Sequence, residues 1–307
     1  MKIFILTEGG REAGFGHIAR CISLYEAFLE RGIAPEFLMD CDESAQVLLK
    51  DTNIEITNWT KGKDELLKRI DKNDIIVIDS YVADKSLYDE VSDLTCGKIV
   101  MIDDYSRLDY PEGIVINPCV CGEEVSYSSK DNVRYLLGKD YIILRKEFWN
   151  IPKKEIKKEI KDILITFGGI RRLDLMKSVT DYLSEKRGIK LNPITRASAK
   201  EMKEAMLDAD LCISGGGQTT NELARVGLPT ISISFADNQR FNLKGWQDRG
   251  FVEYAGAHTD PDLLENINSA LDKLFSFEER NKRSQIGRKS VDGKGAKRIV
   301  EAALKGF

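Results

Sequence analysis

A short segment near the N-terminus combines a residue suited to acid–base chemistry with residues that let a ligand come close. Gly14-Phe15-Gly16-His17 lies between an apolar run and a stretch with helical spacing, and Arg20 follows one turn later. Glycines allow a tight turn, and the start of a helix suits an anion. Because an imidazole titrates near neutral pH, His17 is predicted to take or give a proton. The alternatives are a histidine that caps the helix and a dinucleotide-binding loop, which fits poorly because Ala19 occupies the third glycine position.

A second segment has three consecutive glycines followed by hydroxyl side chains. Ser214-Gly215-Gly216-Gly217-Gln218-Thr219 follows an apolar run and opens a helix. Such glycines are costly inside a packed element, but they fit where a diphosphate lies against bare N–H groups at a helix start. Glu222 falls in the first turns of that helix, where it could reach a ribose diol. The alternative is a tight turn with a capped helix, and a Walker loop is excluded because the closing Lys-Ser/Thr pair is absent.

Polar residues and glycines also follow two other apolar runs in this half. Asn238, Gln239 and Asn242 come after residues 230–233, and side-chain amides suit sugar hydroxyls because they both donate and accept. The alternative is an ordinary polar loop. Gly168-Gly169 follows residues 162–167 and is a second place where a phosphate or another backbone could approach.

Carboxylates end two apolar runs of the first half. Asp79 follows residues 74–78, and Asp103-Asp104 follows residues 98–102. These side chains could bind substrate hydroxyls or orient a histidine. They could equally cap the helices that follow, and the spacing does not separate these interpretations.

The elements that would position these residues alternate along the chain. Apolar runs predict strands at 3–6, 35–39, 74–79, 98–102, 114–116, 162–167, 211–213 and 230–233. Amphipathic stretches predict helices at 18–31, 44–50, 64–70, 173–184, 199–207, 221–226, 262–275 and 294–304. This alternation predicts parallel, doubly wound sheets, which bind ligands at the carboxyl ends of their strands. A charged stretch with Pro152 predicts a linker, and hence domains at 1–150 and 151–307. The last helix could return to the first domain.

Composition narrows the classes of partner. The chain has 307 residues and a formal net charge of −4, which argues against a general nucleic-acid or membrane surface. No apolar stretch is long enough to insert in a membrane and none forms a leader, so we expect a cytoplasmic protein. The six scattered cysteines, including the pair Cys119 and Cys121, do not predict a metal site. The sequence carries no signal of oligomeric state.

Taken together, these residues resemble the UDP-sugar hydrolases of pseudaminic acid biosynthesis (PseG) and the related SpsG spore-coat polysaccharide proteins. The matching segments run in order over nearly the whole chain: Gly14–His17 with Arg20, Asp79, Asp103-Asp104, 144–148, Gly168-Gly169, 214–229, 237–239 with Asn242, and 292–296.

The resemblance implies an α/β fold of two Rossmann-like, doubly wound domains facing across a cleft, as in the GT-B-like MurG glycosyltransferases. It implies hydrolysis of UDP-2,4-diacetamido-2,4,6-trideoxy-L-altrose or a related UDP-sugar, without a metal or cofactor. His17, in the first domain, would activate the water. Substrate contacts would come from Gly14, Gly16, Arg20, Asp79, Asp104, Asn238, Gln239 and Asn242. The nucleotide would be held in the second domain by Gly168, Gly169, Ser214, Gly215, Gly216, Gly217, Thr219 and Glu222.

Two other functions compete with this hypothesis. MurG-like glycosyltransferases also use a UDP-sugar and also carry a glycine turn with a histidine in the first domain. Transferases with membrane acceptors usually show a basic, apolar patch in that domain, and its absence from this sequence favours the hydrolase. A non-catalytic nucleotide-sugar-binding protein is disfavoured because His17 stands within its full loop.

One segment departs from the family pattern. After Gly168-Gly169 the pattern has a small residue and then an aspartate, whereas this chain has Ile170-Arg171-Arg172. We expect a pair of cations near the phosphates to alter which nucleotide or sugar is bound, and the sequence does not assign their role.

Overall fold

The computed structural model describes the chain except residues 11–13, 43–53, 169–171 and 188, and the side chains of residues 186 and 187 are also outside it. The helix predicted over residues 44–50, as well as Gly169 and Arg171, therefore lie outside the described residues. Contacts divide the chain into two compact units. Unit 1 consists of Met1–Arg145 with Lys294–Phe307, and unit 2 of Lys146–Gly293. Unit 2 thus begins a few residues before the predicted boundary.

Unit 1 is built on a parallel sheet with the strand order β3-β2-β1-β4-β5-β6-β7. Its strands are β1 (Ile3–Gly9), β2 (Glu36–Cys41), β3 (Ile54–Ile56), β4 (Ile75–Asp79), β5 (Ile99–Ile102), β6 (Gly113–Asn117) and β7 (Val133–Leu137). The central strands are almost wholly apolar and buried, as expected where helices cover both faces of a sheet.

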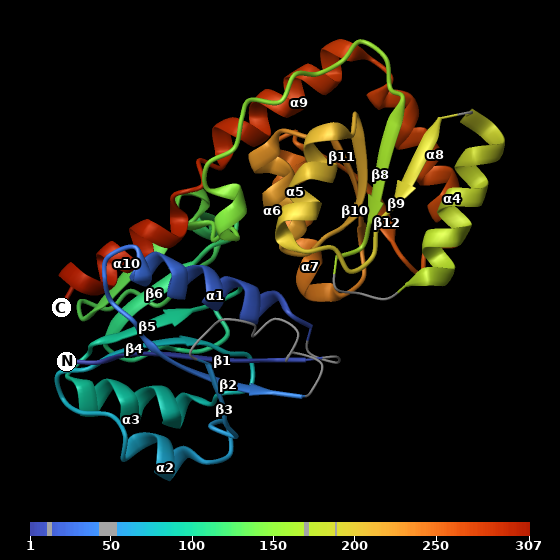
Figure 1. Ribbon diagram of the computed structural model, residues 1–307. Helices are drawn as coiled ribbons and strands as arrows, with labels where there is room; N and C mark the ends of the chain where they lie inside the picture. Colours follow the sequence, from blue (N-terminus) through green and yellow to red (C-terminus); the bar gives the residue numbers. More distant parts are fainter. Residues whose placement is uncertain (11–13, 43–53, 169–171, 188) are drawn as a thin grey trace. The chain divides into compact units, whose positions relative to one another are not determined.

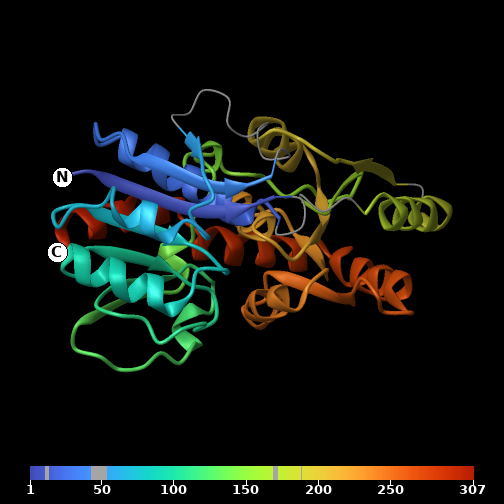
Figure 2. The same ribbon diagram turned by 90° about the horizontal axis from the view of Figure 1, so that it is seen from below.

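Helices lie over both faces of this sheet (Figure 1). On one face are α1 (Gly16–Leu29) and α10 (Gly295–Lys305), and on the other α2 (Lys63–Leu67) and α3 (Lys85–Thr95). Short 3-10 turns occupy Gly122–Glu124 and Lys139–Tyr141. The C-terminal helix α10 packs on α1, and Lys297 pairs with Glu30 at 2.6 Å. Both termini therefore lie on the same side of unit 1 (Figure 1, Figure 2).

Unit 2 repeats this architecture on a smaller scale. Its sheet is parallel, with the order β12-β11-β10-β8-β9. The strands are β8 (Asp162–Thr166), β9 (Lys190–Pro193), β10 (Leu211–Gly215), β11 (Thr230–Ser234) and β12 (Val252–Ala257). The helices are α4 (Leu173–Arg187), α5 (Ala199–Asp208), α6 (Thr219–Val226), α7 (Asp237–Asp248), α8 (Leu263–Leu274) and α9 (Phe277–Ser290), and a 3-10 turn covers Lys146–Phe148.

The strands that the sequence analysis omits are the edge strands β3, β7, β9 and β12. An edge strand is covered less than a central one, and each of these four carries exposed or half-buried positions that break the apolar run. The helices α3, α7 and α9 are also omitted, and the predicted polar loop after β11 is in fact the first turns of α7. None of the described helices is long and apolar enough to cross a membrane.

Candidate active site

The start of α1 and the carboxyl ends of β4 and β5 bring four predicted site residues together in unit 1. His17 and Arg20 lie on α1, Asp79 ends β4, and Asp104 follows β5. Strands β1 and β4 are parallel neighbours with Thr7 beside Asp79, so the chain that leaves β1 begins α1 near the end of β4. The parallel pairing thus brings His17 into contact with Asp79, which is 62 positions away in the sequence.

Asp79 is the centre of this cluster. Its Oδ1 atom lies 2.6 Å from His17 Nδ1 and accepts a hydrogen bond of 2.8 Å from Arg20 Nη2. Its Oδ2 atom accepts from Arg20 Nε at 2.9 Å, and Arg20 Nη1 donates to Asp104 Oδ1 at 2.7 Å. Asp79 is fully buried, and His17 and Arg20 are each only 8% exposed. Since a buried carboxylate must be paired, the Arg20 guanidinium stabilises the charge that Asp79 presents to the histidine.

This arrangement determines which nitrogen of His17 carries the proton. Nδ1 lies 2.6 Å from the Asp79 carboxylate, which only accepts hydrogen bonds, and 3.2 Å from Arg20 Nη2, which only donates; the shorter contact places the proton on Nδ1. The lone pair of the neutral ring is then on Nε2, which has no hydrogen-bond partner within the described part of the chain. Asp79 also stabilises the imidazolium that forms when Nε2 takes a proton. The geometry is that of a general base oriented by a buried carboxylate.

The two neighbouring aspartates after β5 have different roles. Asp103 accepts hydrogen bonds from the backbone N–H groups of Ser106 and Arg107, at 2.6 and 3.1 Å, and so holds a turn. Asp104 faces the histidine cluster. Burial alone would raise the pKa of Asp104, but the Arg20 guanidinium holds that pKa below its ordinary value. Asp104 is therefore a carboxylate at neutral pH, and a carboxylate can accept hydrogen bonds from sugar hydroxyls and amide N–H groups.

Two residues of this cluster, Tyr81 and Glu8, are absent from the sequence-based predictions. The Tyr81 hydroxyl donates to Asp104 Oδ2 at 2.5 Å, and its ring meets the His17 ring edge-on with centroids 4.2 Å apart. Glu8 Oε1 accepts from the Tyr81 backbone N–H at 2.6 Å, whereas its buried Oε2 atom has no hydrogen-bond partner among the described residues. Burial raises the pKa of Glu8. The available signal was position alone, because Tyr81 and Glu8 stand at the ends of two predicted strands.

The predicted glycines of unit 1 lie where the chain turns into α1. Gly14 has a φ of +82°, which favours glycine, and it exchanges two backbone hydrogen bonds with Gly10 at 2.8 and 3.0 Å. A Cβ atom added to Gly14 or Gly16 would meet no atom within 4 Å. The backbone conformation explains Gly14, and open space lies beside both glycines at the mouth of the His17 site.

The three glycines of unit 2 are there for different reasons. A Cβ atom on Gly216 would lie 2.5 Å from Leu243 Cδ1, and one on Gly215 would lie 3.1 Å from the Phe235 ring. Packing therefore explains these two positions. On Gly217 the nearest atom would be Gln239 Nε2 at 3.9 Å, so this glycine borders open space. Gly217 stands just before α6, where the positive end of the helix dipole favours an anion.

The other predicted nucleotide-contacting residues surround this loop. Ser214 is fully buried, and its hydroxyl donates to Gly215 O at 3.0 Å, which places it in the loop framework. Gly168 has a φ of +65°, and its missing Cβ would lie 3.4 Å from Thr219 Oγ1. The loop after β8 thus reaches the start of α6. Glu222 is 1% exposed within α6, so its contact with a ribose stays a prediction.

The three predicted sugar-contacting amides occupy the first turns of α7. Asn238 is exposed. Gln239 Oε1 accepts from the Phe235 backbone N–H at 2.9 Å, which leaves its amide nitrogen toward the glycine loop. Asn242 Oδ1 is buried and has no hydrogen-bond partner among the described residues. Of the three, the structure places Gln239 beside the glycine loop, and the sugar contacts of all three stay predictions.

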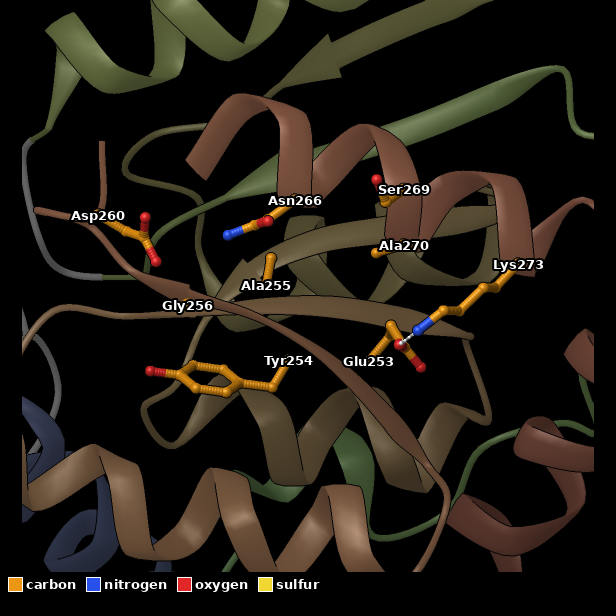
Figure 3. A pocket seen from close by; sticks show the side chains of 9 residues that line it. All are labelled: Glu253, Tyr254, Ala255, Gly256, Asp260, Asn266, Ser269, Ala270 and Lys273. Carbon is orange, nitrogen blue, oxygen red and sulfur yellow. Dashed lines mark hydrogen bonds and ion pairs between the residues drawn. The ribbon is translucent and has the colours of Figure 1, made fainter. Parts of the chain in front are cut away.

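Neither a metal site nor the cavity beside β12 adds to the candidate site in the described part of the chain. Within the described ranges no group of three His, Cys, Asp or Glu side chains could hold a metal ion. A cavity of about 310 Å³ lies beside β12 and α8 (Figure 3). Glu253 on its wall is already paired with Lys273 at 2.6 Å and with Arg283 at 2.7 Å. None of the predicted site residues lines this cavity, so it provides no argument for the function.

The chain is similar in sequence and in fold to several known proteins. Residues 150–301 match the model of the family described as glycosyltransferase family 28 C-terminal domain. The chain is 24% identical to the spore coat polysaccharide biosynthesis protein SpsG of Bacillus subtilis, over 98% of this chain and 97% of that protein. It is 22% identical to the Helicobacter pylori protein named pseudaminic acid cytidylyltransferase and UDP-2,4-diacetamido-2,4,6-trideoxy-beta-L-altropyranose hydrolase, over 87% of this chain and 51% of that protein.

A third relative is the uncharacterized protein MJ1062 of Methanocaldococcus jannaschii, 25% identical over 78% of this chain and 57% of that protein. The chain thus spans about half the length of two of these three relatives. Among solved structures, Acinetobacter baumannii MurG superposes with a TM-score of 0.65 at 16% identity, covering 99% of this chain and 100% of that one. The spinosyn rhamnosyltransferase SpnG superposes with a TM-score of 0.62 at 10% identity, covering 98% and 100%. These likenesses confirm the predicted fold class of two parallel-sheet α/β domains.

Proposed function

We propose that this chain, a homologue of SpsG and of PseG-type pseudaminic acid proteins, hydrolyses a UDP-sugar. Its residues 150–301 match the glycosyltransferase family 28 C-terminal domain. The substrate is UDP-2,4-diacetamido-2,4,6-trideoxy-β-L-altropyranose or a close relative, and the products are UDP and the free sugar. The reaction uses water as acceptor and needs no metal ion.

One observation carries this proposal: the buried hydrogen bond between His17 and Asp79. It leaves the basic Nε2 nitrogen available to remove a proton from water. The water oxygen forms a bond to the anomeric carbon while the bond from that carbon to the diphosphate oxygen breaks. The electron pair of the broken bond leaves with UDP, and the water proton goes to His17 Nε2. A positioned base of this kind contributes about 10²–10⁴-fold to a rate.

The residues around His17 suit the sugar. Asp104 presents a carboxylate and Tyr81 an aromatic ring, and Arg20 fixes the first of these. Val82 and Tyr105, at 63% and 46% exposure, add apolar surface after the same strands. A trideoxy sugar with two acetamido groups offers amide donors and methyl groups, so it has the polar and apolar parts that these side chains can contact.

The residues around the glycine loop suit the leaving group. Gly217 borders open space just before α6, and Thr219 adds a hydroxyl in the first turn. Backbone N–H groups at such a helix start stabilise negative charge, and that charge increases on the diphosphate as the bond to the sugar breaks.

The test is UDP release from the UDP-sugar with no acceptor and with a chelator present. We expect steady turnover by the wild-type protein, and a loss of about 10²–10⁴-fold in kcat for His17→Gln, which keeps a polar side chain but removes the base. UDP binding by the variant, measured by calorimetry, should stay within a few-fold of wild type. Full turnover by His17→Gln would refute the assignment of the base.

A glycosyltransferase is the second candidate, favoured by the family 28 match and by the likeness to MurG. The same experiment separates the two functions. A transferase would bind UDP and the UDP-sugar but release UDP only when a sugar or lipid acceptor is added. Release in water alone, at a rate that added acceptors do not raise, supports the hydrolase.

A further inference from the structure

Two side chains of unit 2 that the proposed reaction leaves unused are joined at the carboxyl end of its sheet. Arg172, directly before α4, lies with Nη2 2.9 Å from Nε2 of His258, directly after β12. A guanidinium only donates hydrogen bonds, so His258 Nε2 must accept and the ring must be neutral. Its Nδ1 nitrogen then carries the proton and lies 3.3 Å from the Ser234 carbonyl oxygen. His258 is thereby held at both nitrogens.

The His258 ring connects Arg172 to the glycine loop through a series of packed rings. His258 stacks on Phe235 with centroids 5.3 Å apart and an interplanar angle of 27°. Phe235 packs in turn against Phe167 at 5.1 Å, and its ring fills the space that a side chain at Gly215 would need. The guanidinium is therefore oriented on the same carboxyl edge from which the loops after β8, β10 and β11 project.

Arg172 is exposed, and among the described residues of unit 2 no carboxylate is paired with it. Arg283 of the same unit, by contrast, pairs with both Glu253 and Glu279. A neutral histidine fixes the direction of the guanidinium without neutralising it, which leaves the cation able to bind an anion.

We propose that Arg172, oriented by His258, binds the diphosphate of the nucleotide-sugar and stabilises the charge that develops on departing UDP. This inference rests on the proposed function, because that function supplies the diphosphate. A planar guanidinium can donate two parallel hydrogen bonds to a phosphate, which makes arginine better suited than lysine to this contact. Arg172 is thus a substrate-contacting residue, and His258 a positioning residue.

The experiment titrates wild type, Arg172→Gln and Arg172→Lys with UDP, uridine and inorganic pyrophosphate by calorimetry. We expect Arg172→Gln to lose about 10- to 100-fold in UDP affinity, the value of a charge-assisted hydrogen bond, and to keep its uridine affinity. Arg172→Lys should lie between the two. His258→Phe keeps a ring on Phe235 but removes the acceptor, and it should weaken UDP binding by less than Arg172→Gln does.

Lys177→Gln is the matched control, because it removes an exposed cation from α4 that is already paired with Asp181. Its UDP affinity should equal that of wild type. Unchanged UDP binding by Arg172→Gln would overturn the proposal, and so would an equal loss of uridine binding, which would place the contact at the nucleoside. If wild type binds UDP in an Arg172-dependent way but releases no UDP from the UDP-sugar in water, the contact with the diphosphate stands and the proposed hydrolysis fails. If wild type binds neither UDP nor pyrophosphate, both fail.

Discussion

Replacing Asp79 by asparagine tests how the buried carboxylate acts on His17. Asp79 offers four acceptor lone pairs and uses them for one contact with His17 and two with Arg20. An asparagine has a single acceptor oxygen. If that oxygen faces His17, the amide N–H₂ points at the Arg20 Nε donor. If the oxygen faces Arg20 Nε, the N–H₂ group points at His17 Nδ1, which must then accept, and the imidazole proton moves to Nε2.

Either orientation is costly because the site is buried. Asp79 is fully buried, and Arg20 would keep its 2.7 Å hydrogen bond to Asp104 and one of its two hydrogen bonds to position 79, while its other donor would face the amide N–H₂. Breaking a buried ion pair costs about 3–5 kcal/mol, and the remaining partner of Arg20 favours the lower end, about 3 kcal/mol. For a domain of this size each kcal/mol shifts Tm by about 2–4 °C, so we expect a loss of roughly 6–12 °C. The wrong tautomer lowers kcat by about 10⁴-fold in the serine protease triad, and we expect a loss of about 10³–10⁴-fold here.

The assay is favourable because the chain has only two histidines. Nitrogen NMR of protein labelled at histidine should show His17 as the Nδ1–H tautomer in wild type, with His258 as an internal reference. In Asp79→Asn it should show the Nε2–H tautomer if the amide N–H₂ faces His17 and the Nδ1–H tautomer if the oxygen does; kcat should fall in both cases, because a neutral amide does not stabilise the imidazolium as a carboxylate does. UDP release gives kcat, and UDP binding at the glycine loop should not change. A variant that folds and keeps the wild-type tautomer and kcat would refute the reasoning.

Three further variants test neighbouring contacts. Tyr81→Phe removes only the hydroxyl that binds Asp104, so unfolding in urea should show a loss of about 1–3 kcal/mol, and wild-type stability would contradict the contact. Glu8→Gln removes a carboxyl whose pKa burial raises in the folded state. Wild-type stability falls as pH rises from the ordinary glutamate pKa through that raised pKa, so the stability of the variant relative to wild type should increase over the same interval, and parallel curves would contradict this. Gly216→Ala places a methyl 2.5 Å from the buried Leu243. This overpacking should lower the free energy of unfolding of unit 2 by about 1–3 kcal/mol in the same urea assay. An unchanged midpoint would show that the loop can shift.

The sequence predicts the central parts of this fold and misses its edges for a physical reason. Central strands such as β4 are continuous apolar runs, which periodicity detects. The edge strand β7 contains an exposed arginine, and β12 is buried only at Val252 and Ala255 of its six positions. Helix α9 is missed because arginines are among the residues it buries: Arg280 donates to the carbonyl oxygens of Leu274 and Lys157 at 2.8 Å each. A helix of this kind has no apolar stripe to find.

The candidate site could be predicted in part for similar reasons. His17 has a local signal in its glycine turn, and Asp79 has one in its strand, but their contact depends on the pairing of β1 with β4. The sequence allows Asp79 either to cap the next helix or to orient a histidine. The tertiary structure separates these roles, because Asp84 caps α3 and Asp79 contacts His17. Glu8 has only its position near the end of a predicted strand as a signal, because what distinguishes it is a buried oxygen that no described residue contacts by a hydrogen bond.

The central claim is that His17 directs water to the anomeric carbon, and hydrolysis in water labelled with ¹⁸O tests it most directly. Attack at carbon places the label in the sugar, so mass spectrometry should find the released UDP unlabelled, with release lost in His17→Gln. Reading UDP avoids the exchange of the anomeric oxygen of the free sugar with solvent. UDP that carries one ¹⁸O atom would show cleavage at phosphorus, and no UDP without an added acceptor would show a transferase; either result would contradict the mechanism.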